Sequence, residues 1–140
     1  MIAKKIISTL GAAKAGVFQR LENDSDLMSV VNGVFDAVEK GTKFPYIVLG
    51  EMTAIPFDSK QSAGQEVTLT IHTWSDYPGD DEILSVIHPK ILRAISHSPI
   101  DVGENLGVML ARLDTEETIQ EPDGRIRQGI IRLRFRIMEV

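Results

Sequence analysis

The apolar positions near the N-terminus follow a helical period. They recur every three or four residues at Ile2, Ile6, Leu10, Ala13, Val17 and Leu21. This spacing is typical of a helix with one buried face. Gly11 and Gly16 each weaken such a helix by roughly 1 kcal/mol relative to alanine, so packing must hold it. Asp24 and Ser25 can cap a second, short helix around residues 27–31.

Two stretches in the middle of the chain favour β-strands. The run FPYIVL at 44–49 is apolar and rich in strand formers, and the chain stays extended towards Ile55. A second strand begins near Val67, where apolar residues alternate with Thr68, Thr70 and His72, and it ends near Ser75. The segment 57–65 between them is polar and contains glycine, so we expect a mobile loop there.

A third helix is predicted to begin at the acidic residues Asp80, Asp81 and Glu82, where negative charge suits the helix dipole. Its apolar stripe comprises Ile83, Leu84, Ile87, Ile91, Leu92 and Ile95. Pro89 falls inside this stripe. Proline in a helix interior costs about 3 kcal/mol, so we expect a kink over residues 85–88.

The C-terminal third predicts a long antiparallel hairpin. The sequence EPDGR at 121–125 is a turn signal, because proline presets the turn and Gly124 can take the left-handed conformation. If Glu121 pairs with Arg125, then Thr115, Leu113, Ala111 and Met109 lie opposite Ile131, Leu133, Phe135 and Ile137. That face is almost entirely apolar and should pack on the core. On the other face, Asp114 should meet Arg132, and Arg112 should lie opposite Arg134, with Asp114 diagonal to it.

The order of these elements indicates an α+β fold. We expect an antiparallel β-sheet of about four strands, with helices packed on one face and a long C-terminal β-hairpin. The length of 140 residues suits a single domain over 1–140. No stretch approaches the ~20 apolar residues that a membrane-spanning helix needs, so we expect no membrane partner.

The composition and motifs argue against several kinds of active site. The chain has no cysteine, which excludes disulfides, thiolate metal sites and a cysteine nucleophile. His72, His88 and His97 lack metal-ligand spacing, and we interpret them as surface or partly buried side chains. A hydrolase using the carboxylates between 116 and 123 would need a pocket, and we keep it as a minor alternative. We therefore expect no enzymatic activity, no metal and no cofactor.

Arg132, Arg134 and Arg136 should lie side by side on one face of the last strand. Such a row could contact nucleic-acid phosphates, pair with carboxylates such as Asp114, or form a subunit interface. The formal net charge of -5 favours pairing, within or between subunits, over nucleic acid. A small nucleic-acid-binding module that uses this arginine face is the alternative function.

The order of segments resembles the tail terminator, or tail-completion, proteins of long-tailed bacteriophages and prophages. The resemblance is carried by FPYIVLG at 44–50, VTLTIHTWSDYPG at 67–79 with DDEIL after it, and RLRFRI at 132–137. It implies a structural virion protein without catalytic residues. Such proteins form a hexameric ring that caps the tail tube, stops its polymerisation and provides the joint to the head. For the isolated protein, both an assembled ring and a monomer stay open as oligomeric states.

The resemblance also implies partners and a location. The partners would be further copies of the chain, the tail tube protein and the head connector protein, while DNA would pass through the ring without sequence-specific contact. The protein would lie in the virion tail, and in the host cytoplasm during assembly. The loop at 57–64 and the hairpin tip at 119–126 would reach axial partners. The candidate interface residues are Arg112, Asp114, Arg132, Arg134 and Arg136 on the sheet, Asp58, Lys60 and Gln61 in the loop, and Glu121 and Asp123 at the tip.

Overall fold

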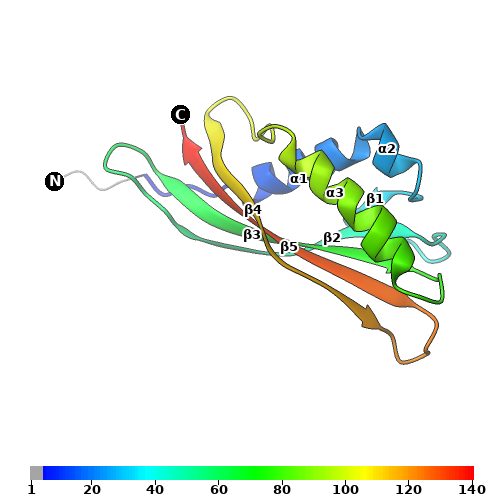
Figure 1. Ribbon diagram of the computed structural model, residues 1–140. Helices are drawn as coiled ribbons and strands as arrows, with labels where there is room; N and C mark the ends of the chain where they lie inside the picture. The colour runs from blue at the N-terminus through cyan, green and yellow to red at the C-terminus, as the bar shows by residue number, and fades with distance from the viewer. Residues whose placement is uncertain (1–4) are drawn as a thin grey trace.

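A computed structural model describes residues 5–140 and shows one β-sheet with helices on one of its faces (Figure 1). The strands are β1 (Val34–Phe35), β2 (Tyr46–Pro56), β3 (Gly64–Ser75), β4 (Leu106–Gln120) and β5 (Arg127–Glu139). Their order in the sheet is β1-β2-β3-β5-β4. The short β1 runs parallel to β2, and the other neighbours are antiparallel. The predicted α+β class, helix layer and C-terminal hairpin are confirmed.

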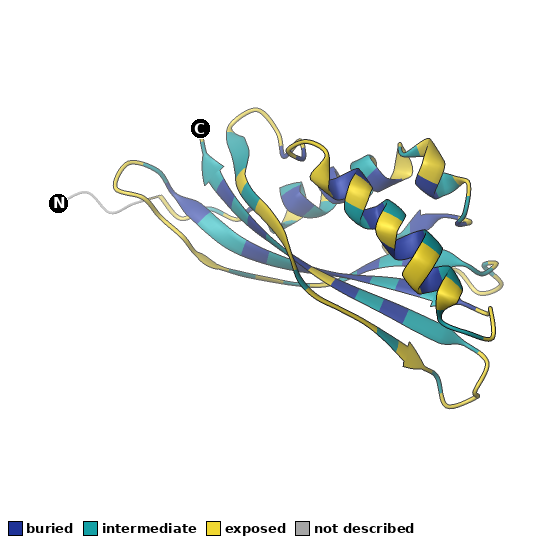
Figure 2. Ribbon diagram, in the orientation of Figure 1, coloured by how far each residue is buried: buried dark blue, intermediate teal, exposed yellow. Residues whose placement is uncertain are grey.

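The core lies between the sheet and the helices α1 (Leu10–Glu22), α2 (Ser25–Met28), η1 (Glu82–Ile87, a π-helix) and α3 (His88–Ser96). The two central strands supply its floor, with Val67, Leu69, Ile71, Ile131, Leu133, Phe135 and Ile137 at most 2% exposed. We call this the inner face of the sheet and the opposite one the outer face. Alternating burial along β5 is visible in Figure 2. Within residues 5–140, no helix is long and apolar enough to cross a membrane.

The first helix begins later than its apolar spacing predicted. Ala13, Val17 and Leu21 are buried as expected, but α1 starts at Leu10, and Ile6 lies before it with 97% of its surface exposed. Ile2 lies outside the described residues. The reason is a pair of hydrogen bonds between distant parts of the chain. The backbone N–H and the hydroxyl of Thr9 both donate to Oε1 of Gln65, at 2.7 and 2.8 Å, which fixes the chain to β3 just before the helix.

The predicted irregularity around Pro89 takes the form of a π-helical turn. The segment η1 immediately precedes α3, and Pro89 is the second residue of α3. Proline has no N–H and its ring crowds the preceding turn, and a wider π-helical turn accommodates both defects. Most of the predicted apolar stripe is buried against the sheet. Leu92 is partly buried, and Leu84 is the most exposed member of the stripe, with 44% of its surface exposed.

The hairpin register is correct in its middle and wrong towards both ends. Leu113 pairs with Leu133, and Ala111 with Phe135, as predicted. Register shifts between Val108 and Leu110, and between Leu113 and Thr115, change the partners elsewhere. The ends therefore pair Val108 with Ile137 and Glu116 with Ile131, in place of Met109 and Thr115.

The turn of the hairpin is also wider than predicted. The N–H of Glu121 donates to the carbonyl of Ile126 at 2.9 Å, so Glu121 does not pair with Arg125. Gly124 has a φ of 75°, which is the left-handed conformation expected of it.

The outermost strand β4 is much more exposed than its apolar residues predicted (Figure 2). Met109 and Leu113 are 54% and 43% exposed, and Ala111 is also exposed. The helices pack over the other strands, so the inner side of β4 is left largely uncovered. The prediction of a buried hairpin face is therefore right for β5 and wrong for β4.

Candidate assembly surfaces

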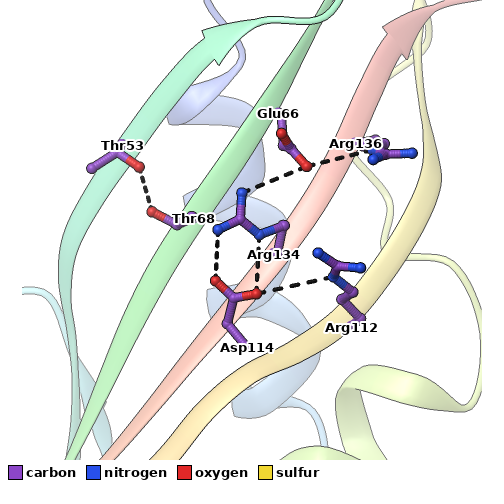
Figure 3. Close-up of polar contacts among 7 residues, drawn as sticks. All are labelled: Thr53, Glu66, Thr68, Arg112, Asp114, Arg134 and Arg136. Atoms are coloured by element: carbon purple, nitrogen blue, oxygen red, sulfur yellow. Dashed lines mark hydrogen bonds and ion pairs between the residues drawn. The ribbon is translucent and has the colours of Figure 1, made fainter.

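Five side chains form a charge cluster on the outer face, made of Glu66, Arg112, Asp114, Arg134 and Arg136 (Figure 3). Nε and Nη2 of Arg134 donate to the two carboxylate oxygens of Asp114, at 3.0 and 2.7 Å. Nη1 of Arg134 lies 3.5 Å from Oε1 of Glu66, and Nε of Arg136 lies 3.5 Å from the same oxygen. Nε of Arg112 lies 4.0 Å from Asp114. Arg134 and Arg136 thus find carboxylates within their own chain.

Asp114 meets Arg134 and not Arg132, which corrects the predicted pairing. The cause is the register shift between Leu113 and Thr115, which leaves Asp114 as the extra residue of a bulge. A bulge re-aims the side chain of its extra residue. Here it turns the carboxylate towards Arg134, where two parallel hydrogen bonds give the geometry preferred by arginine and carboxylate.

The pair Arg134–Asp114 is electrostatically matched. The hydrogen bond from Arg134 lowers the pKa of Asp114, and the charges of Arg134, Arg112 and Arg132 act in the same direction. The hydrogen bond to Asp114 likewise raises the pKa of Arg134. Both side chains are about three-quarters covered or more, with 26% and 19% of their surfaces exposed. Much of the arginine row is therefore neutralised by neighbouring strands.

Two further contacts extend this polar face towards the other edge of the sheet. The guanidinium of Arg136 lies 4.4 Å from the ring centroid of Phe57, a cation–π contact at the end of β2. The hydroxyls of Thr53 on β2 and Thr68 on β3 are hydrogen-bonded to each other (Figure 3). Polar contacts thus occur from β4 to β2 on this part of the outer face.

Arg132 lies on the outer face beside this cluster and is exposed. His72 points away from the core, as predicted, and its Nε2 lies 3.0 Å from Oε2 of Glu51. That hydrogen bond is the main cause that lowers the pKa of Glu51, and Arg132 adds a smaller effect. Within residues 5–140, no group of three or more His, Asp or Glu side chains could hold a metal ion.

The loop between β2 and β3 spans 57–63, because β3 already begins at Gly64. The predicted site residue Asp58 is used inside the loop, where its Oδ1 accepts from the N–H of Gly64 at 3.0 Å. Ser59 closes the loop by accepting from the N–H of Ser62 at 3.0 Å. Lys60 and Gln61 are exposed at its tip. Lys60 and Gln61 therefore present exposed side chains to a partner.

The tip of the β4–β5 hairpin is also held by its own hydrogen bonds. Oδ1 of Asp123 accepts from the N–H groups of Arg125 and Ile126, at 2.9 and 3.0 Å. These bonds lower the pKa of Asp123. A shallow hollow beside the tip is lined by Phe44, Tyr46, Trp74, Glu121, Pro122, Asp123 and Ile126. Glu121 and Asp123 therefore border an aromatic surface at this end of the sheet.

One buried polar contact was missed by sequence reasoning. His88 is fully buried, where a surface or partly buried histidine was expected, and its Nδ1 lies 2.7 Å from Oε2 of Glu116 on β4. A carboxylate accepts, so Nδ1 carries the proton, and among the described residues 5–140 Nε2 has no hydrogen-bond partner. Burial lowers the pKa of His88, against the opposing effect of Glu116. No signal in the sequence marks this contact, because it depends on a helix and a strand 28 residues apart.

Comparisons with known proteins agree with this geometry. A protein of Bacillus phage SPP1, tail completion protein gp17, is 29% identical over 126 residues, which cover 90% of this chain and 92% of that protein. The solved structure of SPP1 gp17 is 28% identical, covers 91% of this chain and 88% of its own, and superimposes with a TM-score of 0.59.

A chain in the virion of a native gene transfer agent particle has the same fold. It superimposes with a TM-score of 0.84 at 20% sequence identity, over 96% of this chain and all of that one. The family described as tail completion protein gp17 matches residues 15–138. As the order of its segments indicated, the chain belongs to the tail completion protein gp17 family.

Proposed function

We propose that this chain is a tail terminator subunit of a bacteriophage or prophage. In this role it caps the tail tube, stops its polymerisation and provides the joint to the head. The observation that carries the proposal is the family match over residues 15–138. A fold shared with a chain of a virion particle supports a place in an assembled structure.

The arrangement of the two long hairpins supports contacts along an axis. The β2–β3 loop and the β4–β5 tip lie at opposite ends of the sheet (Figure 1). In a hexameric ring with the strands running roughly along the axis, one set of tips would face the tail tube and the other the head connector. Lys60 and Gln61 would contribute at one end, and Glu121 and Asp123 at the other.

The arginine row gives less support to a nucleic-acid-binding module. Arg134 shares its charge with Asp114 and Glu66, and Arg136 contacts Glu66 and the ring of Phe57. Phosphate contact would have to break these pairs. We therefore expect DNA to pass through the ring as cargo. Salt-dependent DNA binding that weakens on replacing Arg132, Arg134 and Arg136 would instead favour the alternative.

Electron microscopy of purified tails tests the proposed position directly. Tails carrying a tagged copy of this chain should be labelled at one end only, the end that joins the head. A ring-shaped density there should vanish when the gene is deleted and return on complementation. Label along the tube, or at the end distant from the head, would overturn the proposal.

A further inference from the structure

The sheet has two edges along which a strand lacks a neighbour within residues 5–140, and these free edges differ in length. On one side, β4 is the outermost strand over its whole length of 15 residues. On the other side, β1 pairs with β2 only at Ile47 and Val48, so the later part of β2 forms an edge of its own within the described residues. A long edge strand with exposed apolar side chains invites pairing with another chain, unless it is protected.

Bulges interrupt both edges and divide them into shorter regular runs, and on β4 a second regular run, 115–120, lies beyond the last bulge. On β4, the shifts at Met109 and Asp114 bracket the run 110–113. On β2, the shift between Leu49 and Met52 precedes the run 52–55, and Pro56 ends it because proline offers no N–H. The runs 110–113 and 52–55 are equal in length.

The two runs also have the same distribution of side chains between the faces. On the inner face, β4 presents Ala111 and Leu113, and β2 presents Met52 and Ala54, as their partners on β5 and β3 show. On the outer face, β4 presents Leu110 and Arg112, and β2 presents Thr53 and Ile55. Leu113 and Ile55 are 43% and 57% exposed, so each run has apolar surface left to bury.

The strand directions allow the two edges to join. Neighbouring strands from β2 to β4 alternate in direction across three antiparallel pairs, so β2 and β4 run in opposite directions. A second copy placed beside β4, with its inner face on the same side, would offer its β2 as an antiparallel partner. The contact joins two different edges, so it is heterologous, and repeated contacts of that kind form a ring when the rotation between copies closes.

We propose that β4 of one copy pairs antiparallel with β2 of the next, with Ala111 opposite Ala54. This proposal rests on the proposed ring and names the contact that builds it. In this register, Leu113 faces Met52 on the inner side, and Leu110 faces Ile55 on the outer side. Arg112 lies opposite Thr53 and diagonal to Glu51, whose side chain is 72% exposed, so the one cation of the run meets a carboxylate.

Pairing of β4 with β4 around a two-fold axis is the competing arrangement. Centred on the same run, it would bring the Arg112 side chains of both copies together on one face. The side chain of Arg112 is 56% exposed, and it comes no closer to Asp114 than 4.0 Å, so its charge is not fully compensated. Like charges in neighbouring positions across strands are destabilising, which favours the β4–β2 contact.

Cysteine cross-linking tests the register, because the natural chain contains no cysteine. The double variant Ala54→Cys/Ala111→Cys replaces two small, incompletely buried residues. Residues opposite each other in antiparallel strands are about 4.5–5.5 Å apart at Cα, within the range for a disulfide. Mild oxidation of tails assembled with this variant should give a ladder of covalent oligomers in non-reducing electrophoresis, ending at the full ring.

Matched variants separate the possible outcomes. Ala54→Cys/Thr118→Cys moves the cysteine seven residues along the same side of β4 and should give no ladder. Ala111→Cys alone should stay monomeric, and efficient dimers from it would show β4–β4 pairing and overturn the proposal. Leu113→Lys, added to the double variant, should abolish the ladder while leaving the circular dichroism spectrum unchanged.

The same tails distinguish this proposal from the proposed function. If the double variant is present at the head-joining end but forms no ladder, the strand contact is wrong and the terminator role stands. If the natural protein is absent from purified tails, both the strand contact in a tail ring and the terminator role are wrong. An equally strong ladder from the Thr118→Cys control would refute the register.

Discussion

At the scale of single residues, His88 links the helix layer to the exposed edge strand. It stands at the start of α3 beneath the π-helical turn, and its Nδ1–H donates to Glu116 of β4. Its ring also lies so close to Gly129 of β5 that an added Cβ there would come within 2.4 Å of Nε2. The contact therefore fixes where β4 and β5 lie relative to α3.

Removing the acceptor of this contact should destabilise the fold. Glu116→Ala leaves the buried Nδ1–H of His88 unsatisfied, which should cost about 1–3 kcal/mol of unfolding free energy. Glu117→Ala is the matched control, since Glu117 is exposed and lies on the outer face, and its effect should stay within about 0.5 kcal/mol. Urea unfolding followed by circular dichroism measures both. Equal effects of the two substitutions would contradict the role given to His88.

The lowered pKa of Asp114 should make the unfolding free energy depend on pH in the acid range. Arg134 holds the folded-state pKa of Asp114 below its ordinary value, so the unfolded chain takes up this proton first as the pH falls. The stabilisation is present above the unfolded pKa of about 3.9 and is lost as the pH falls through the folded pKa. The unfolding free energy of the natural chain should exceed that of Asp114→Asn at pH 6, and the difference should shrink towards pH 3. A constant difference would refute this account.

At the scale of elements, alternation along the sequence predicted the strands well but not which of them the helices cover. Leu113 and Leu133 face each other, as predicted, yet only Leu133 is buried. How far a helix layer extends over a sheet is a property of the packed molecule, and periodicity does not contain it. The bulge at Asp114 was missed because residues 115–118 after it are all polar, so no change of apolar phase marks the extra residue.

The start of α1 shows the same limit from another direction. Its apolar spacing continues back to Ile6, but Thr9 is hydrogen-bonded to Gln65, and the helix begins only at Leu10. A contact between residues 56 positions apart has no local sequence signal. By contrast, the turn glycine, the short capped helix and the break near Pro89 each depend on neighbouring residues, and all three were predictable.

Truncating the two facing leucines should separate core from edge. Leu133 is 2% exposed, so Leu133→Ala should cost about 2–5 kcal/mol of unfolding free energy. Leu113→Ala, at 43% exposure, removes little buried surface in the isolated chain and should cost clearly less. Denaturant unfolding of both variants measures the difference. Similar losses would mean that β4 is covered in solution, for example by another copy.

At the scale of the whole molecule, the order of segments pointed to the family, and the pairing within the arginine row fits an assembly role. Arg134 lies opposite Arg112, as predicted. The carboxylate of Asp114 reaches Arg134 because Asp114 is the extra residue of a bulge, which was not predicted. The loop and the hairpin tip were predicted from the sequence, but the two free edges were not, because edges emerge only when the strands take their order in the sheet. In the proposed ring, the two loop ends and the two free edges would supply four directions for contact, two along the axis and two around it.

In the proposed role, this chain ends the growth of the tail tube. The length distribution of tails from a strain lacking the gene tests it most directly, measured by electron microscopy beside the complemented strain. We expect tubes of variable and excessive length that are not joined to heads, with normal lengths and joining restored by complementation. Tails of normal, uniform length attached to heads in the deletion strain would contradict it.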